Sequence, residues 1–241
     1  MMAGRGLQHK MSTTAAGIAG GVRTLRFWST TIGKKAVMAV TGVILAAFIL
    51  GHLAGNLQIF LGPEQFNGYA RFLHSVPELL WPVRIVLLVS VVLHIWSSLQ
   101  LAVIKSEARP MGYVKSKPTG SSYASRTMYW SGPILAAFVV YHLMHFTFGA
   151  GGTPYQELDA YGNVINGFRV PIVAIFYILA MGLLCLHLRH GLWSMFQSLG
   201  FAHPRHTPRI QRAASLVSLL VFFGFVSIPV AVLTRLIPQV I

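Results

Sequence analysis

Cysteine and acidic residues are scarce in this chain of 241 residues. Its single cysteine, Cys185, lies in an apolar run, which excludes an intrachain disulfide, a cysteine-based zinc site and a cysteine-ligated iron–sulfur cluster. Charged residues make up only 10% of the chain, whereas a soluble domain carries about 25%. This composition argues against a water-soluble globular enzyme, and an aromatic content of 12% excludes a disordered chain.

Apolar residues are abundant, at 54% of the chain, and the mean hydropathy is +0.63. Five apolar segments are long enough to cross a bilayer, which requires about 20 residues for a helix. We therefore predict an all-α integral membrane bundle of five transmembrane helices. The predicted membrane domain spans residues 33–241 and follows a basic cytoplasmic tail of residues 1–32, with helices at 33–60, 81–105, 128–149, 169–198 and 212–237.

Three segments between these helices are too polar to span a membrane. Residues 61–78 read LGPEQFNGYARFLHSVPE, and residues 106–127 are rich in Ser, Gly, Lys and Arg. Residues 150–168 contain several glycines and a proline, which predicts a turn-rich loop.

The basic residues fall unequally on the two sides of the predicted helices. Four lie on one side: Arg71, Arg84, Arg169 and Arg235. Fifteen lie on the other: Arg5, Lys10, Arg23, Arg26, Lys34, Lys35, Lys105, Arg109, Lys115, Lys117, Arg126, Arg189, Arg205, Arg209 and Arg212. Cytoplasmic loops carry the excess of Lys and Arg, so we predict a cytoplasmic N-terminus and an external C-terminus. The net charge of +14 therefore indicates membrane topology, and no nucleic-acid partner is expected.

Histidines occur inside four of the five predicted helices: His52, His94, His142, His145, His187 and His190. Ionisable residues inside a membrane are costly, so a functional role is the first hypothesis. At 1.5 Å per residue, His52 and His142 lie ~28 and ~21 Å from the cytoplasmic ends of their helices. His94 and His187 each lie ~16 Å from that side. The histidines thus form an outer and an inner layer.

Two imidazoles that face each other at one depth can ligate a haem iron axially. Two layers therefore predict two haems b, one near each face of the membrane. The layers contain no carboxylate or thiolate neighbours, which favours haem over a tetrahedral zinc or copper site. His145 remains an alternative to His142, because its depth is closer to that of His52. His190 remains an alternative to His187, because the two share a helix face.

A short repeat accompanies the outer layer. Thr41-Gly42 precedes His52, and Ser131-Gly132 precedes His142, with each glycine ten residues before its histidine. A glycine on the side facing a haem leaves room for the porphyrin. Candidate cofactor-binding residues are therefore Gly42 and Gly132. Trp130 and Arg169 are candidate partners of a propionate, and His190 is a candidate partner of a propionate or of the quinone.

Quinone chemistry needs hydrogen-bond donors and a proton route. The external segment after the first helix offers a group of such side chains, and these are the candidates for a quinone site: Glu64, Tyr69, Arg71, His74 and Glu78.

The sequence resembles the five-helix, di-haem cytochrome b subunits of succinate:quinone oxidoreductases (complex II) and the related fumarate reductases. The resemblance covers residues 30–237 and consists of TG-x9-H followed by LAGNLQIF, then LHIW, YHLMHF and HLRHGLW, in that order. It implies one axial histidine on each of the first four helices: His52, His94, His142 and His187. It also implies that His52 and His142 bind the haem that is far from the hydrophilic subunits.

The resemblance further implies a role in the respiratory chain and the tricarboxylic acid cycle. The chain would anchor a flavoprotein and an iron–sulfur subunit to the bacterial cytoplasmic membrane, in contact with lipid. A higher oligomer of the complex is an open alternative. Electrons from succinate would reach a membrane quinone, with menaquinone expected. The dicarboxylate chemistry belongs to another subunit, because this chain has no Rossmann-type glycine motif.

Two other functions fit parts of the pattern. A transporter with a histidine proton relay would need intramembrane acids or paired broken helices, and neither is present in the sequence. The cytochrome b of another respiratory complex, such as a hydrogenase or a formate dehydrogenase, would also carry haem. Only the identity of the associated subunits distinguishes such a cytochrome b from a complex II subunit.

Overall fold

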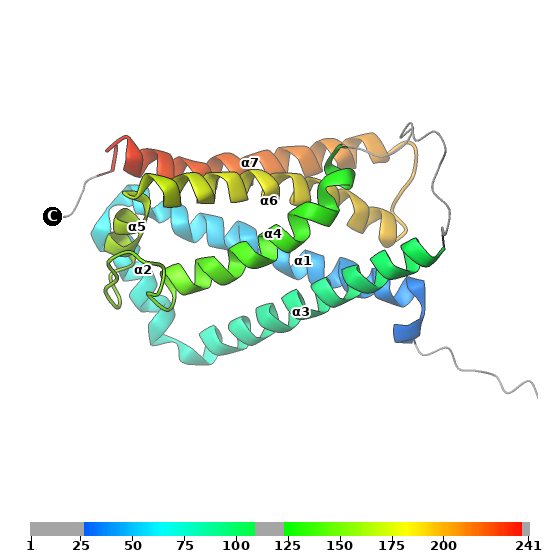
Figure 1. Ribbon diagram of the computed structural model, residues 1–241, viewed down its shortest axis with the longest axis horizontal. Helices are drawn as coiled ribbons and strands as arrows, with labels where there is room; N and C mark the ends of the chain where they lie inside the picture. The colour runs from blue at the N-terminus through cyan, green and yellow to red at the C-terminus, as the bar shows by residue number, and fades with distance from the viewer. Residues whose placement is uncertain (1–26, 109–122, 238–241) are drawn as a thin grey trace, which may run out of the picture.

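The computed structural model describes residues 27–108 and 123–237, and every regular element in these residues is helical (Figure 1). The all-α prediction is confirmed. Most of the predicted basic tail, residues 1–26, lies outside the described residues. The elements are η1 (Phe27–Ser29), α1 (Thr31–Asn56), η2 (Leu57–Leu61), α2 (Pro63–Ser75), α3 (Pro77–Glu107), α4 (Tyr123–Phe146), α5 (Ala160–Phe168), α6 (Pro171–Ser198) and α7 (Thr207–Leu233).

The long helices α1, α3, α4, α6 and α7 run along the long axis of an elongated bundle (Figure 1). Helix α6 packs against α7 and α4, while α3 packs mainly against α1. The short helices α2 and α5 lie together at one end, which we call the α5 end. The opposite end, which we call the basic end, carries the described basic side chains Lys34, Lys35, Lys105, Arg126, Arg189, Arg205, Arg209 and Arg212.

Within residues 27–108 and 123–237, four helical segments are long and apolar enough to cross a membrane: Thr31–Leu61, Pro77–Glu107, Pro171–Ser198 and Thr207–Leu233. They carry many exposed apolar side chains, and only 6% of the most apolar stretch of α3 is buried. Such surfaces suit contact with lipid. Helix α4 is 24 residues long, so it measures ~36 Å. Its hydropathy is lower because it includes His142, His145 and a polar first turn.

The helix boundaries differ from the predicted ranges by a few residues. The α-helix of the predicted 33–60 segment ends at Asn56, and a tighter 3-10 turn continues to Leu61. The predicted 128–149 helix is found at Tyr123–Phe146, and the predicted 212–237 helix starts at Thr207 and ends at Leu233.

The expectation of a turn-rich loop at residues 150–168 is wrong for its second half, which forms α5. The Asp159 side chain caps this helix by accepting a hydrogen bond from Gly162 N at 3.0 Å. Tyr161, Ile165 and Phe168 lie on one face and are buried. A helix with one buried face forms here because its apolar residues have the helical period, although the flanking glycines suggest turns.

The most densely buried region of the protein surrounds α5. Ile59 of η2, Ile165 of α5 and Val232 of α7 are each 1% exposed, and Tyr161 is fully buried. Residues of η2, α2, α4, α5, α6 and α7 thus meet in one apolar cluster. This cluster holds the helix ends together at the α5 end, which is the end nearer to His52 and His142.

A side chain of α2 ties this helix to the start of α5. Asn67 donates to Asp159 Oδ1 at 2.8 Å and accepts from the backbone N–H of Tyr161 at 2.8 Å. Asp159 is also the cap of α5, so one amide side chain holds the cap and the first turn together. The two short helices are therefore joined by hydrogen bonds as well as by apolar packing.

Replacing Asn67 with alanine should lower the free energy of unfolding by about 1–3 kcal/mol, because its hydrogen bonds with Asp159 and with the Tyr161 N–H are lost. The measurement is the thermal unfolding midpoint of the detergent-solubilised protein. Gln65→Ala is the matched control on the same helix, since Gln65 is exposed and its contact with Gln58 is 3.5 Å long. Equal midpoints for the two variants would contradict this role of Asn67.

Candidate functional site: two pairs of facing histidines

Two pairs of histidines face each other inside the bundle. The rings of His52 on α1 and His142 on α4 have centroids 5.8 Å apart. The rings of His94 on α3 and His187 on α6 have centroids 6.3 Å apart. The structure therefore brings together the same pairs that the depth argument placed in one layer. We call them the outer pair and the inner pair.

The ring separations fit two imidazoles bound to one metal ion. A bond from a metal to an imidazole nitrogen is about 2 Å long, which places two opposite nitrogens about 4 Å apart and the ring centroids about 6 Å apart. Both observed separations are close to this value. In the described part of the chain no group of three or more His, Cys, Asp or Glu side chains is arranged to hold a metal ion. The pairs thus suit a metal that takes its remaining ligands from a porphyrin.

The outer pair lies among aromatic rings. Phe48 stacks on His52 at a centroid distance of 5.2 Å, and Phe138 and Phe146 lie 5.9 and 5.7 Å from His142. Among the described residues, Nδ1 of His142 is a buried polar atom without a hydrogen-bond partner. Buried polar atoms are nearly always paired, so this imidazole is suited to a partner from outside the chain.

The inner pair has two hydroxyl groups at its Nδ1 atoms. Thr41 Oγ1 on α1 lies 3.1 Å from Nδ1 of His94, and Ser131 Oγ on α4 lies 3.4 Å from Nδ1 of His187. A Cβ atom added to Gly42 would lie 3.5 Å from Cε1 of the His94 ring. The Thr-Gly pair of α1 therefore directly borders an imidazole of the inner layer.

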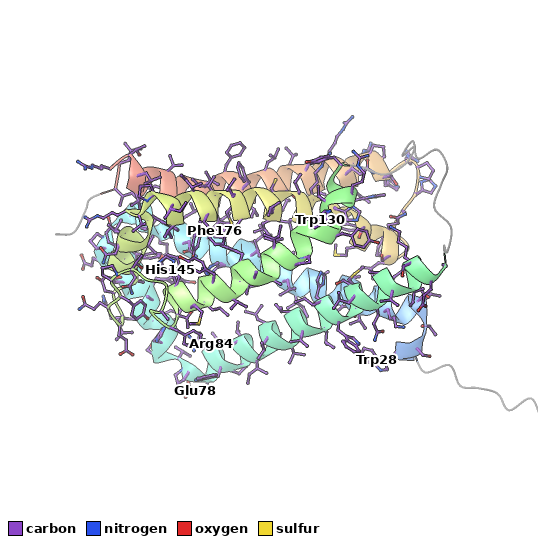
Figure 2. All side chains as sticks on the ribbon, viewed as in Figure 1. Trp28, Glu78, Arg84, Trp130, His145 and Phe176 are labelled. Atoms are coloured by element: carbon purple, nitrogen blue, oxygen red, sulfur yellow. The ribbon has the colours of Figure 1, made fainter. Side chains whose placement is uncertain are left out.

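His145 has a different environment from His142. It is 2% exposed, and its ring nitrogens contact the Tyr177 hydroxyl at 3.0 Å and Thr153 Oγ1 at 2.9 Å. Figure 2 shows its side chain at the α5 end of α4. A Cβ added to Gly167 would lie 2.7 Å from the ring, so α5 packs directly on it. Both nitrogens already have protein partners, which favours His142 as the ligand.

The other candidate residues are spread over both ends. Trp130 is 75% exposed and lies toward the basic end (Figure 2), and Arg169 is exposed at the end of α5. A Cβ on Gly132 would contact nothing within 4 Å, so this glycine borders open space. His190 is half-buried one turn beyond His187, toward the basic end of α6.

Four of the five quinone candidates are exposed at the α5 end: Glu64, Arg71, His74 and Glu78. Tyr69 is half-buried and packs on α1, because a Cβ added to Gly55 would lie 2.8 Å from its ring. Among the described residues, no hydrogen bond or ion pair joins any two of the five candidates. They do not form a compact polar site as a group.

The histidine pairs lie in a chain that matches one family of known proteins. The sequence profile of the succinate dehydrogenase/fumarate reductase transmembrane subunit family matches residues 105–226, just over half of the chain. This chain belongs to that family. The matched region includes all of α4 and α6 and most of α7, and therefore one histidine of each pair. As a member of this transmembrane family with several apolar helices, the protein is a multi-pass membrane protein.

A curated member of the family is also similar. The succinate dehydrogenase cytochrome b558 subunit of Bacillus subtilis (strain 168) is 25% identical over 186 residues, which cover 76% of this chain and 86% of the relative. No solved structure matches the chain. The resemblance of the sequence to succinate dehydrogenase and fumarate reductase membrane subunits is thus confirmed.

Several polar partners of the histidines were not predicted from the sequence. Tyr177 and Thr153 contact His145 from α6 and from the segment before α5, and no local pattern indicates this. Thr41 and Ser131 belong to the repeat Thr41-Gly42 and Ser131-Gly132, which predicts a role for the glycines but not for the hydroxyls. The available signal was their spacing of eleven residues from His52 and His142.

His145→Ala should lower the free energy of unfolding by about 2–4 kcal/mol, because it leaves a cavity and removes the partner of a buried hydroxyl. Tyr177→Phe, which removes one hydrogen bond only, should cost about 1–2 kcal/mol. Thermal unfolding in detergent measures both effects. The control is His206→Ala, since His206 is exposed. The assignment fails if His145→Ala and His206→Ala unfold at the same temperature.

Proposed function

We propose that this protein is the membrane-anchoring cytochrome b subunit of a bacterial succinate:quinone oxidoreductase, with two bis-histidine haems b between an iron–sulfur subunit and a membrane quinone. The observation that supports it is the presence of two facing histidine pairs, with ring centroids 5.8 and 6.3 Å apart, in a chain of this family. The relative from Bacillus subtilis is a cytochrome by name, which agrees with haem binding.

The residues of this chain hold the haems and insulate them. We assign His52 and His142 to the outer haem, and His94 and His187 to the inner haem. A neutral imidazole presents a nitrogen lone pair to iron, and the apolar bundle around it favours the neutral form. When bound, each haem supplies a group that accepts and releases one electron. The protein provides the two depths at which these groups are fixed.

The topology that we propose has five spans, with α4 as the fifth. At ~36 Å it is long enough for a hydrocarbon core of about 30 Å. Its histidines then face the bundle interior, where polar side chains in membranes are usually found. By the positive-inside rule, the basic end is cytoplasmic and the α5 end is external. The iron–sulfur and flavoprotein subunits dock at the basic end in this arrangement.

The quinone site that we propose lies at the α5 end, near the outer pair. Glu64 and His74 of α2 supply exposed groups that can exchange protons there, and Arg71 supplies an exposed hydrogen-bond donor. Tyr69 connects α2 to α1 through its contact with Gly55, three residues from His52. Menaquinone remains the expected substrate.

Purification of the native complex tests the proposed function. We expect a flavoprotein and an iron–sulfur protein to co-purify with this chain, and succinate to reduce the haems in the preparation. Co-purification with a hydrogenase or formate dehydrogenase large subunit, and no reduction by succinate, would overturn the proposal in favour of another respiratory complex.

Substitution of the histidines tests the haem assignment. Each of His52→Ala, His94→Ala, His142→Ala and His187→Ala should remove one of two haems, because an axial ligand is lost. His145→Ala and His190→Ala should keep both, since neither ring belongs to a facing pair. Haem is counted by pyridine haemochrome and by reduced-minus-oxidised difference spectra. Two haems in His94→Ala or His187→Ala would contradict the inner site.

A further inference from the structure

Each histidine of the inner pair lies beside a hydroxyl group from a helix that carries a histidine of the outer pair. Thr41 lies on α1, whose imidazole in the outer pair is His52, and Ser131 lies on α4, whose imidazole is His142. Thr41 is 5% exposed and Ser131 is fully buried. Neither hydroxyl therefore meets bulk solvent, and each lies beside an Nδ1 atom of the inner pair.

The direction of the hydrogen bond at His94 follows from the other contacts of Thr41. Its Oγ1 donates its single proton to a backbone carbonyl, that of Val37 at 2.7 Å or that of Met38 at 3.2 Å. The Met38 carbonyl is also a hydrogen-bond partner of the His94 ring. A hydroxyl has one proton and two lone pairs, so Oγ1 faces Nδ1 of His94 as an acceptor, at 3.1 Å. Nδ1 then carries the proton of the neutral imidazole, and the lone pair is on Nε2.

The spacing of the repeat explains how one helix serves both layers. Thr41 and His52 are eleven residues apart, as are Ser131 and His142. Eleven residues make about three helical turns, so both side chains of each helix point to the same face, ~16.5 Å apart along the axis. On each of α1 and α4, the histidine therefore lies at the depth of the outer pair and the hydroxyl lies at the depth of the inner pair.

We propose that Thr41 and Ser131 are positioning residues of the inner haem: their hydroxyls accept a hydrogen bond from Nδ1–H of His94 and His187 and so orient Nε2 toward the iron. This inference rests on the proposed function, because it requires a haem between these two imidazoles. Metal-bound histidines commonly donate their second ring N–H in this way, which fixes the tautomer and makes the ligand more basic.

The hydroxyls also set the potential of the inner haem. A more basic imidazole stabilises ferric iron over ferrous iron, so an acceptor at Nδ1–H lowers the reduction potential. Removing the acceptor should raise that potential. The effect should be larger for Thr41, because the contact of Ser131 with His187 is 3.4 Å long, beyond the usual range for N–H···O bonds.

The test is a redox titration of the haem absorbance in the purified complex, with Thr41→Val and Ser131→Ala. The inner haem is identified as the component that His94→Ala lacks. We expect Thr41→Val to shift its reduction equilibrium about threefold, or about 28 mV at 59 mV per tenfold, to higher potential. Ser131→Ala should shift it in the same direction by less, and the outer haem should not move.

Two further variants separate a specific effect from general disturbance. Thr41→Ser keeps the hydroxyl and should restore the wild-type potential. Ser218→Ala on α7 is the matched control, because Ser218 is fully buried and its Oγ donates to the Ala214 carbonyl at 2.6 Å, as Thr41 does to Val37. It should leave both haems unchanged.

The possible failures are distinguishable. Two haems with wild-type potentials in both Thr41→Val and Ser131→Ala would overturn this inference and leave the proposed function intact. A shift of equal size in Ser218→Ala would also overturn it, since the effect would not then depend on a contact with histidine. An unchanged haem content in His94→Ala would instead contradict the inner haem site of the proposed function.

Discussion

Each imidazole nitrogen inside an apolar bundle needs a partner, and this constraint governs the structure. A polar group without a hydrogen-bond partner in a membrane interior destabilises the protein, and apolar packing does not compensate for it. His145 meets the requirement with two protein hydroxyls, and His94 meets half of it with Thr41. His142 has a buried Nδ1 without a protein partner in the described part of the chain. The histidines therefore divide into those that hold the fold and those that are suited to bind a cofactor.

The helices are arranged so that each pair draws on two of them. Helices α1 and α4 supply the outer imidazoles, and α3 and α6 supply the inner ones. Because α1 and α4 also supply the hydroxyls beside the inner pair, all four helices contribute to the inner site. A displacement of α1 or α4 would consequently disturb both depths, which links the two sites mechanically through rigid helices.

The two ends of the bundle differ in packing and in charge. At the α5 end, η2, α2 and α5 cover the helix ends with a tightly packed apolar cluster and partly buried hydrogen bonds. His145 belongs to this cover, since its ring joins α4 to α6 and to the segment before α5. The basic end carries Lys and Arg side chains from five long helices, and within the described residues these sit beside few acids. In the topology that we propose, the tightly packed α5 end is the external cap and the basic end is the docking face for the hydrophilic subunits.

Much of this architecture follows from periodicity and composition. Long apolar runs predict the long helices, because a helix in lipid satisfies its own backbone. Local apolar spacing would also have indicated α5, where Tyr161, Ile165 and Phe168 share a face, but Gly151, Gly152 and Gly162 favoured a loop. Boundaries such as the change to a 3-10 turn after Asn56 depend on contacts with other elements and were not predicted.

Residue type and helical rise are enough to predict the all-α class, the depth of each histidine along its helix and the asymmetry of charge. They leave open whether His142 or His145 faces His52, since both lie within one turn of the same helix. The packing of the helices distinguishes the two: Tyr177 and Thr153 lie at the ring nitrogens of His145, while the ring of His142 lies against that of His52. Side chains from distant parts of the chain make these contacts, so the choice of partner for each imidazole exists only once the helices have packed.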